Sequence, residues 1–315
     1  MTASAPPSTS LVGILGAGPF GRALARAARR TDHQVVLWSR RRVEPPAPGI
    51  EITHHHGRLA EADLILLAVP SPHVEAAAER LAPHLEGRHL LVHVSRGLLG
   101  EELETIGAML ARRTAARRIG ALAGPLSAEA LAAGAPAAAM LGTPFPEVAE
   151  AVRDTLQSPT LRIERTADRC GVEVASALVG LMALAVGYVQ GNGLGPAPLS
   201  ALLVRALAEA RTLGRLLGAE PSTFDGLAGV GDLLAAALGD ERPEVRIGRA
   251  LARGEPLEEA ARAAGGHVEG VRLAARLAAF AREHGLPAPL TEALAEAIEG
   301  TRQGWRNLLG ALQAG

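Results

Sequence analysis

The sequence predicts an α/β protein with an N-terminal, Rossmann-type doubly wound parallel sheet and a C-terminal all-helical domain. Up to about residue 166, short apolar runs alternate with helix-compatible segments, which is typical of parallel strand–helix–strand units. Beyond that point the strand pattern stops, and long segments rich in Ala, Leu, Glu and Arg follow. The chain has 315 residues, enough for two domains of ~150 residues. We expect a flexible tail over 1–10, a nucleotide-binding domain over 11–166 and a helical domain over 167–315.

Short apolar runs mark the expected strands of the N-terminal sheet, which we predict to contain about seven or eight strands. The runs are 11–15, 34–38, 63–69, 89–94, 119–123, 137–141 and 161–164. Amphipathic segments over 21–30, 72–85 and 100–115 predict helices that cover the faces of the sheet.

Long apolar-periodic segments, with Gly and Pro at their ends, mark the expected helices of the C-terminal half. They are 170–189, 199–217, 245–253, 268–284 and 289–300. We expect no sheet in this half. Because several of its Ala-rich helices present small apolar faces, we expect it to form a homodimer.

Composition excludes several classes of protein. The formal net charge of -1 argues against nucleic-acid binding, and 48% hydrophobic residues argue against disorder. We expect no apolar run of about 18 residues, and therefore no transmembrane helix. The first ten residues lack the basic start and apolar segment of a signal peptide. We therefore expect a cytoplasmic protein.

Cysteine and histidine usage gives no metal site. The single cysteine, Cys170, excludes an intramolecular disulfide, and we expect it to be buried rather than reactive. The tract His54–His56 has no carboxylate or cysteine partner at a defined spacing, so we expect a surface loop there. All 32 basic residues are arginines, since the sequence contains no lysine.

A glycine-rich turn follows the first expected strand. Gly16, Gly18 and Gly21 form the pattern G-x-G-x-x-G and open a helix-compatible stretch. In a dinucleotide site the first glycine permits the tight turn, the second lets the backbone approach a pyrophosphate, and the third lets helix and strand pack closely. A purely structural turn is the alternative.

The end of the second expected strand indicates which dinucleotide is bound. An NAD site usually has Asp or Glu about 20 residues after the glycines, but this chain has Ser39, Arg40 and Arg41 there, followed by Arg42. Hydroxyl and guanidinium donors suit a 2′-phosphate, so we predict NADP first and NAD second. A solvated basic turn remains the alternative.

These features, with many further segments, resemble the bacterial NAD(P)-dependent glycerol-3-phosphate dehydrogenase family from about residue 11 to about residue 300. The segments are GILGAGPFGRALA, ADLILLAVPS, LAPHLEGRHLLVHVSRGL, GVEVASAL, LVRALAEARTLGRLLGAEPSTFDGLAGVGDL and RIGRALARG. The resemblance implies that the helical domain of residues 167–315 binds the substrate and is like that of 6-phosphogluconate dehydrogenase. It also implies the interconversion of dihydroxyacetone phosphate and sn-glycerol 3-phosphate.

Residues that match the family's motifs supply the other site candidates. The resemblance implies that Pro19, Phe20, Pro70 and Glu269 contact the cofactor, although a carboxylate near a 2′-phosphate would repel it. Asp232, Arg96 and Arg205 are the retained candidates for the catalytic site. Asp232 is as well explained as a helix N-cap, and Arg205 as a partner in an interhelix ion pair.

The chain departs from the family at the positions that carry the chemistry. Val179 and Gly180 occupy the positions of the family's catalytic lysine and the asparagine after it. Pro243 and Glu244 stand where the phosphate-binding segment has an Arg-Asn pair. We therefore expect an altered or abandoned substrate.

Ketone reduction needs a proton or a fixed positive charge at the oxygen of the substrate. Arg96 supplies charge but is a poor acid, because its guanidinium stays protonated. His93 is the imidazole placed where Rossmann ligands bind, and a structural role is its other explanation. Two functions stay open: an NADP-dependent reductase with an altered substrate, and a catalytically inactive nucleotide-binding protein with a regulatory or scaffold role.

Overall fold

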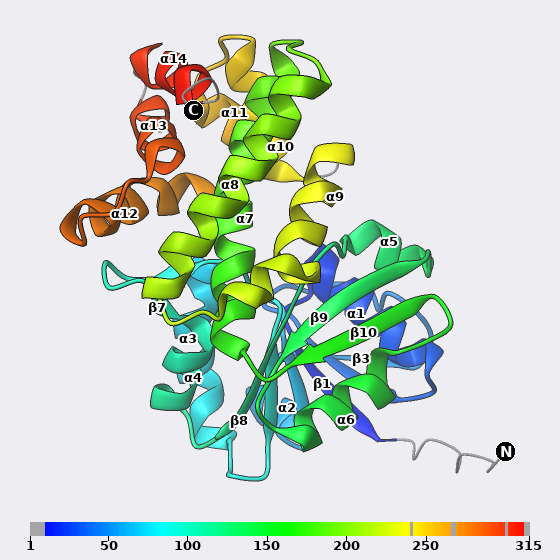
Figure 1. The fold of residues 1–315 in the computed structure, drawn as a ribbon. Helices are drawn as coiled ribbons and strands as arrows, with labels where there is room; N and C mark the ends of the chain where they lie inside the picture. Colours follow the sequence, from blue (N-terminus) through cyan, green and yellow to red (C-terminus); the bar gives the residue numbers. More distant parts are fainter. Residues whose placement is uncertain (1–9, 240–241, 266–268, 300–301, 312–315) are drawn as a thin grey trace, which may run out of the picture. The chain divides into compact units, whose positions relative to one another are not determined.

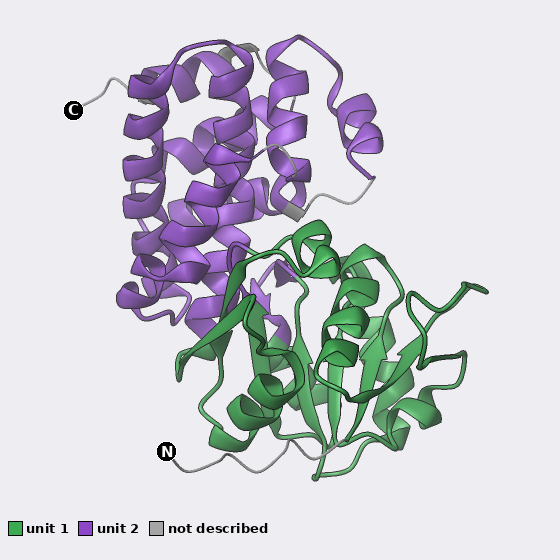
Figure 2. Cartoon of the chain, turned by 90° about the vertical axis from the view of Figure 1, so that its right-hand side faces the viewer, with its two compact units in different colours: residues 1–95, 107–122, 126–169 green, residues 96–106, 123–125, 170–315 purple. Residues whose placement is uncertain are grey.

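The computed structural model describes residues 10–239, 242–265, 269–299 and 302–311, so residues 1–9 of the expected tail lie outside it. The chain divides into two compact units, coloured separately in Figure 2. Unit 1 comprises residues 1–95, 107–122 and 126–169, and unit 2 comprises 96–106, 123–125 and 170–315. Two short segments of the N-terminal half therefore belong to the same unit as the C-terminal helices.

Unit 1 is built on an eight-stranded sheet with the order β10-β9-β8-β5-β4-β1-β2-β3, which confirms the predicted fold class (Figure 1). The strands are β1 Leu11–Leu15, β2 Gln34–Trp38, β3 Ile50–Thr53, β4 Leu64–Leu67, β5 Leu90–His93, β8 Arg118–Ala123, β9 Ala137–Gly142 and β10 Leu161–Thr166. The β1–β2, β1–β4, β2–β3, β4–β5, β5–β8 and β9–β10 pairs are all parallel. Every predicted run is a strand, and the edge strand β3 is the one strand of this sheet that was not predicted.

The order of the strands reverses at β1. The chain passes from β1 outward to β2 and β3, then returns to β4 on the other side of β1. In such sheets ligands bind beyond the carboxyl ends of the strands at this switch point, because the connections diverge there. The glycine turn at residues 16–21 follows β1 and lies at that place.

Helices cover both faces of the sheet. They are α1 Pro19–Arg30, α2 His56–Leu59, α3 Ser71–Leu81, α4 Ile106–Arg113, α5 Ala128–Ala133 and α6 Pro146–Leu156. Alternate strand residues such as Ile14 and Leu66 pack with side chains of α1, α5 and α6 in one apolar core. The intervening Leu15 and Ile65 are equally buried, as expected when the opposite face is also covered.

The helix expected over 100–115 is shorter than predicted. Residues 98–105 form an antiparallel pair, β6 Leu98–Leu99 with β7 Glu104–Thr105, and α4 begins only at Ile106. Gly100 and Leu103 have φ angles of +61° and +55°, which a right-handed helix cannot contain. This hairpin belongs to unit 2, where Arg276 donates to the carbonyl oxygens of Leu98 and Gly100 at 2.9 and 2.6 Å.

Helices make up most of the described part of unit 2. The helices are α7 Arg169–Gly191, α8 Pro196–Leu216, α9 Asp232–Leu238, α10 Pro243–Ala252, α11 Leu257–Ala263, α12 Glu269–Glu283, α13 Pro289–Ile298 and α14 Arg302–Ala311. Among the described residues from 170 onward there is no strand, as predicted.

The expectation that the chain has no apolar run of about 18 residues is wrong, because the central helix α7 contains one. Of the described helices, it alone is long and apolar enough to cross a membrane, with a mean hydropathy of 2.0 over 18 residues. However, 94% of that stretch is buried inside the protein, which is the behaviour of a core helix. Gly187 and Gly248 let α7 and α10 meet backbone to backbone, since a Cβ on Gly248 would lie 2.1 Å from the carbonyl oxygen of Leu184.

Candidate functional site

The glycine turn has the geometry of a dinucleotide cradle. Gly16 has a φ of +118°, and a Cβ there would lie 2.4 Å from the carbonyl oxygen of Ala68 at the end of β4. A Cβ on Gly21 would lie 1.8 Å from the carbonyl oxygen of Gly16, so helix and turn are in backbone contact. Gly18 has no atom within 4 Å of its missing Cβ, so open space lies beside the backbone where a diphosphate would approach.

The first turn of α1 offers hydrogen-bond donors to the same space. Gly18 is the N-cap and provides no side-chain cap, and the first turn has no acidic residue. The amides of Phe20 and Gly21 have no acceptor within the helix, since the first N–H groups of any helix lack one, and Pro19 has no N–H. Pro70, exposed at the N-cap of α3, follows the neighbouring strand β4. The residues present therefore fit a bound pyrophosphate.

The loop after β2 lies beside the glycine turn. The amide of Gly16 donates to the carbonyl oxygen of Trp38 at 3.2 Å. Arg40 and Arg41 are exposed there. Ser39 is only 5% exposed, and its hydroxyl donates to the carbonyl oxygen of Arg41 at 2.7 Å while accepting from the Arg41 amide at 3.2 Å. Its hydroxyl therefore shapes the loop, and the two arginines are the exposed donors.

The histidine tract supports this loop. His54 Nδ1 is 2.6 Å from the carbonyl oxygen of Ser39, and Trp38 Nε1 donates to the carbonyl oxygen of His54 at 3.1 Å. The ring of His56 packs against the ring of Trp38, with centroids 4.6 Å apart. No cluster of three His, Cys, Asp or Glu side chains able to hold a metal occurs among the described residues. No pattern in the sequence indicates that His54 and His56 contact the loop after β2.

A cluster of four charged side chains lies inside unit 2. Asp232, the first residue of α9, is 2% exposed. Arg242 donates through Nη2 to Asp232 Oδ2 at 3.1 Å and through Nη1 to its carbonyl oxygen at 3.3 Å. Arg96 Nη2 lies 3.6 Å from the same Oδ2, and Glu244 Oε2 lies 3.9 Å from Arg242 Nε. The structure thus brings Arg96 and Asp232 together, and Arg242 joins them although it was not among the predicted site residues.

Asp232, Arg242 and Arg96 each lie at or near the end of a helix or strand, which fixes the position of the side chain. Asp232 follows a π-helical turn, Leu227–Gly231, and the helix is capped by Gly231 with no side-chain bond. The alternative that Asp232 is the N-cap is therefore wrong. Arg242 is the residue before α10, where Pro243 occupies the first helical position and needs no N–H partner. Arg96 lies between β5 and β6, with Nη2 3.5 Å from the carbonyl oxygen of Gly124.

Burial controls the protonation of the two acids. It raises the pKa of Asp232 from 3.8 to about 7, against the opposing charge of Arg96 and with a smaller contribution from Glu244. Burial also raises the pKa of Glu244, again opposed by Arg96. Arg242 bonds directly to Asp232 and favours its ionised form as well. A carboxyl that titrates near neutrality beside a permanent cation can exchange a proton under ordinary conditions.

The substituted positions lie beside this cluster. Gly180 of α7 faces Glu244, whose Oε1 would lie 3.7 Å from a Cβ on that glycine. Val179 is 1% exposed, so the position of the family's lysine is filled by a packed aliphatic side chain. The glutamate therefore reaches toward space that a longer side chain at residue 180 would occupy.

The remaining candidates lie elsewhere in their units. Arg205 is half-buried on α8 and is not among the residues joined by the contacts above. His93 is 2% exposed at the end of β5, with Nδ1 3.2 Å from the carbonyl oxygen of Ser95. Cys170 is half-buried, and its thiol donates to the carbonyl oxygen of Leu217 at 3.3 Å. Glu269 begins α12, but its side chain lies outside the described residues.

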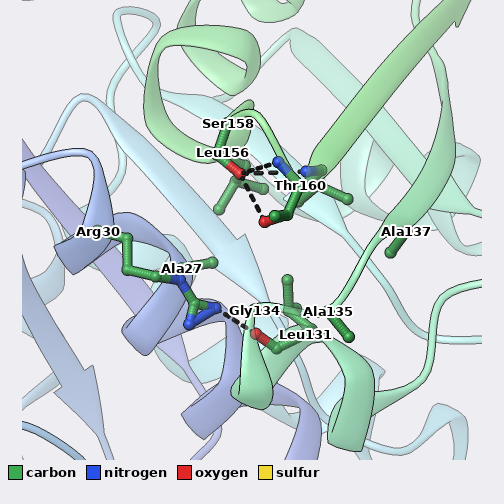
Figure 3. A pocket seen from close by; sticks show the side chains of 10 residues that line it. Ala27, Arg30, Leu131, Gly134, Ala135, Ala137, Leu156, Ser158 and Thr160 are labelled. Atoms are coloured by element: carbon green, nitrogen blue, oxygen red, sulfur yellow. Dashed lines mark hydrogen bonds between the residues drawn. The ribbon is translucent and has the colours of Figure 1, made fainter.

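Neither of two surface hollows is lined by a predicted site residue. One, of about 10 Å³, lies at the amino ends of β9 and β10, away from the glycine turn, and holds one water at most (Figure 3). Arg30 there donates to the carbonyl oxygens of Leu131 and Ala132 at the end of α5. The other, of about 290 Å³, lies between α10 and α11 and is lined by Arg246, Arg249 and Arg253.

Comparison with known proteins adds a family. Residues 50–149 match the family model described as NAD-dependent glycerol-3-phosphate dehydrogenase N-terminus, and residues 168–304 match the corresponding C-terminus model. The glycerol-3-phosphate dehydrogenase [NAD(P)+] of Bradyrhizobium sp. (strain ORS 278) is 34% identical, with 92% of each chain covered. That of Desulfitobacterium hafniense (strain Y51) is 32% identical, covering 89% of this chain and 85% of the relative. The crystal structure of glycerol-3-phosphate dehydrogenase from Coxiella burnetii has a TM-score of 0.90 at 24% identity, with 97% of this chain and 99% of that chain covered.

Proposed function

Because the chain belongs to the NAD-dependent glycerol-3-phosphate dehydrogenase family, we propose that it is an NADP(H)-dependent oxidoreductase acting on a small carbonyl compound and its alcohol. Its substrate differs from that of the relatives, since Val179, Gly180, Pro243 and Glu244 replace the family's polar groups. The observation that carries the proposal is the contact of Arg96 with Asp232, a permanent cation beside a carboxyl that titrates near pH 7.

The domain of residues 11–166 would bind the nucleotide, and that of residues 167–315 the substrate. Gly16, Gly18 and Gly21 would hold the pyrophosphate with the first turn of α1, which agrees with the open space at Gly18. Arg40 and Arg41 would bind the 2′-phosphate of NADP, for which both are exposed. Once bound, the nicotinamide supplies or accepts the hydride.

The cluster in unit 2 would manage the charge on the substrate oxygen. The side chain of Arg96 is 29% exposed and that of Asp232 only 3%, so Arg96 is the member that a substrate can reach. Its guanidinium would stabilise negative charge that develops on the oxygen during reduction. Asp232 would position Arg96 and keep a proton close by, while Arg242 fixes the carboxylate from the other side. Arg205 is a candidate ligand for an anionic substrate.

Turnover of NADPH tests the proposal. We expect oxidation of NADPH with a small carbonyl compound from a panel that includes dihydroxyacetone phosphate. Removing a preorganised charge at a developing oxyanion typically costs about 10²–10³-fold in kcat, and we expect this loss for Arg96→Ala. Asp232→Asn should reduce kcat and remove its titration near pH 7. If these two variants keep wild-type kinetics, the assignment of the cluster is wrong.

A catalytically inactive nucleotide-binding role is the second candidate, and buried Val179 favours it. It predicts tight NADPH binding without oxidation by any carbonyl compound. A Val179→Lys, Gly180→Asn variant tests why turnover is absent. If the variant oxidises NADPH, the substitutions at these two positions cause the loss of activity. If the variant still shows no NADPH oxidation, the substitutions at Pro243 and Glu244 also contribute to the loss of activity.

We also propose a cytoplasmic homodimer that associates through the helical domain. Apolar side chains on α8 and α9 support this, since Val204 is 70% exposed and Leu238 is 87% exposed. Light scattering at micromolar concentration tests it, and a strictly monomeric mass would exclude it.

A further inference from the structure

The charges of the buried cluster cancel one another when both of its acids are ionised. Arg96 and Arg242 carry two positive charges, and Asp232 and Glu244 carry two negative charges when ionised. The two acids are 2% and 8% exposed, so neither is screened by bulk water. When both acids are ionised, an entering ligand therefore meets a neutral cluster rather than a cationic one.

The three guanidinium nitrogens of Arg242 face the two acids of the cluster. Its Nη1 and Nη2 already donate to the backbone and carboxylate oxygens of Asp232, and its Nε faces Glu244 Oε2 at 3.9 Å. The side chain is only 13% exposed. Strong phosphate recognition by arginine usually needs two parallel N–H donors from one guanidinium. If Arg242 turned its Nη groups toward a phosphate, Asp232 would lose its hydrogen bond from Nη2 and keep only Arg96 at 3.6 Å, which is costly for a buried carboxylate.

Glu244 adds a repulsive element. It reaches the space in front of Gly180, where its Oε1 would be 3.7 Å from a Cβ. A carboxylate about 5 Å from each charge of a phosphate would weaken binding by about 100-fold or more at an effective dielectric constant of about 20. The relatives are named for a phosphate monoester, glycerol 3-phosphate, and this chain places an acid beside its cluster instead.

We propose that the substrate site of the helical unit accepts a small carbonyl compound without a phosphate group, and that Glu244 is the specificity-determining residue that excludes phosphate esters. The proposal rests on the proposed function for the reaction itself, but the exclusion of phosphate is a property of these residues alone. The carboxylate of Glu244 would instead accept a hydrogen bond from a hydroxyl group of an uncharged substrate.

Equilibrium binding tests whether phosphate esters are excluded, independently of whether the protein is catalytically active. Calorimetry of glycerol 3-phosphate with the NADP-saturated protein at pH 8, where Asp232 is ionised, should show no saturable binding below millimolar concentration. Glu244→Gln keeps the size of the side chain and removes its charge, and it should raise the affinity at least tenfold. Glu255→Gln, the same change just beyond α10 beside Arg253, should leave binding as in the wild type. Wild-type binding as tight as that of Glu244→Gln would overturn the proposal.

Steady-state turnover tests whether the site accepts a carbonyl compound without a phosphate group. We expect kcat/KM for dihydroxyacetone to exceed that for dihydroxyacetone phosphate by at least tenfold, and Glu244→Gln to narrow this ratio. A wild-type preference for the phosphate ester would overturn the proposal. If neither compound nor any other carbonyl oxidises NADPH although NADPH binds, the proposed function fails and the uncharged substrate fails with it. The calorimetric result then decides whether Glu244 excludes phosphate.

Discussion

Arg242 holds Asp232 at two points, with Nη2 3.1 Å from the carboxylate oxygen Oδ2 and Nη1 3.3 Å from the backbone carbonyl oxygen. The residue before α10 is thereby tied to the first residue of α9, ten positions earlier in the chain. Because Asp232 is almost fully buried, removal of this partner would leave a carboxylate short of compensation. The pair therefore couples the stability of unit 2 to the protonation of its candidate site.

The pH dependence of stability should change in Asp232→Asn. The pKa of Asp232 rises from 3.8 to about 7 on folding, so between these values the native state binds a proton that the unfolded state releases. Its stabilising contribution is complete below about pH 4 and is lost as pH rises through 7. The change amounts to on the order of 4 kcal/mol at most, since one pKa unit corresponds to about 1.4 kcal/mol.

Urea unfolding of Asp232→Asn and wild type at several values between pH 4 and pH 8 measures this. The variant should lose less stability than the wild type as pH rises. Asp154→Asn on α6 of unit 1 removes an exposed carboxylate and should leave the slope unaltered. Parallel curves for Asp232→Asn and wild type would show that Asp232 is ionised throughout.

Substitutions at Gly18 and Gly21 should separate nucleotide binding from folding. Gly18 has ordinary backbone angles, φ -68° and ψ 176°, and open space, so Gly18→Ala should fold normally. Its methyl group fills the approach of the diphosphate, and NADPH affinity should fall at least tenfold. Gly21→Ala places Cβ 1.8 Å from a carbonyl oxygen and should cost about 3 kcal/mol of stability. Thermal unfolding measures the stability of both variants, and calorimetric titration measures their affinity for NADPH. A folded Gly18→Ala protein with full NADPH affinity would show that the glycine turn does not bind the diphosphate.

Arg40→Gln and Arg41→Gln should lower affinity for NADPH and spare affinity for NADH. A hydrogen bond between charged groups contributes about 1.5–3 kcal/mol, so each change should weaken NADPH binding by at least tenfold. Arg153→Gln, an exposed arginine of α6, is the matched control for loss of one positive charge. Equal losses for NADPH and NADH would mean that these arginines do not contact the 2′-phosphate.

Gly248→Ala should destabilise unit 2 strongly. Its Cβ would lie 2.1 Å from the carbonyl oxygen of Leu184 and 2.7 Å from the amide nitrogen of Tyr188, so α7 and α10 would have to separate. Overpacking of this kind typically costs about 1–3 kcal/mol. Gly310→Ala on α14 has open space and should be neutral or slightly stabilising. Similar melting temperatures for the two variants would contradict the close crossing of α7 and α10.

Periodicity in the sequence was sufficient for the strands but not for the contacts that build the site. The central runs, such as those of β4 and β5, are buried on both faces and therefore read as continuous apolar sequence. The edge strand β10 instead alternates buried and exposed residues, which is the pattern of a strand with one covered face. The strand β3 was missed, since Ile50–Thr53 is short, contains Glu51 and follows a proline-rich loop. The 98–105 hairpin was missed because Leu103 gives no sequence signal of its positive φ.

Site residues were predictable where a motif fixes the backbone and not where tertiary contacts decide. The tight turn at Gly16, Gly18 and Gly21 could be predicted because the motif constrains the backbone itself, and its binding of a dinucleotide stays a prediction. Ser39 was expected to bind phosphate, yet its hydroxyl bonds within its own loop, a local competition common for serine. Arg242 contacts Asp232 across ten positions of the sequence, and such a contact leaves no periodic signal.

The interleaving of the two units has a consequence for how the protein is made and how it can evolve. Arg276 bonds to carbonyl groups 178 and 176 residues earlier in the chain, in a segment that also contains Arg96. During synthesis this segment emerges long before its helical partners, so closing unit 2 depends on contacts of high sequence separation, which slow folding. A fragment of residues 170–315 would lack both the hairpin and the arginine of the candidate site. The helical half therefore cannot be moved to another protein as an independent domain. Gene fusions or domain exchanges that cut the chain near residue 169 would divide one folding unit between two chains.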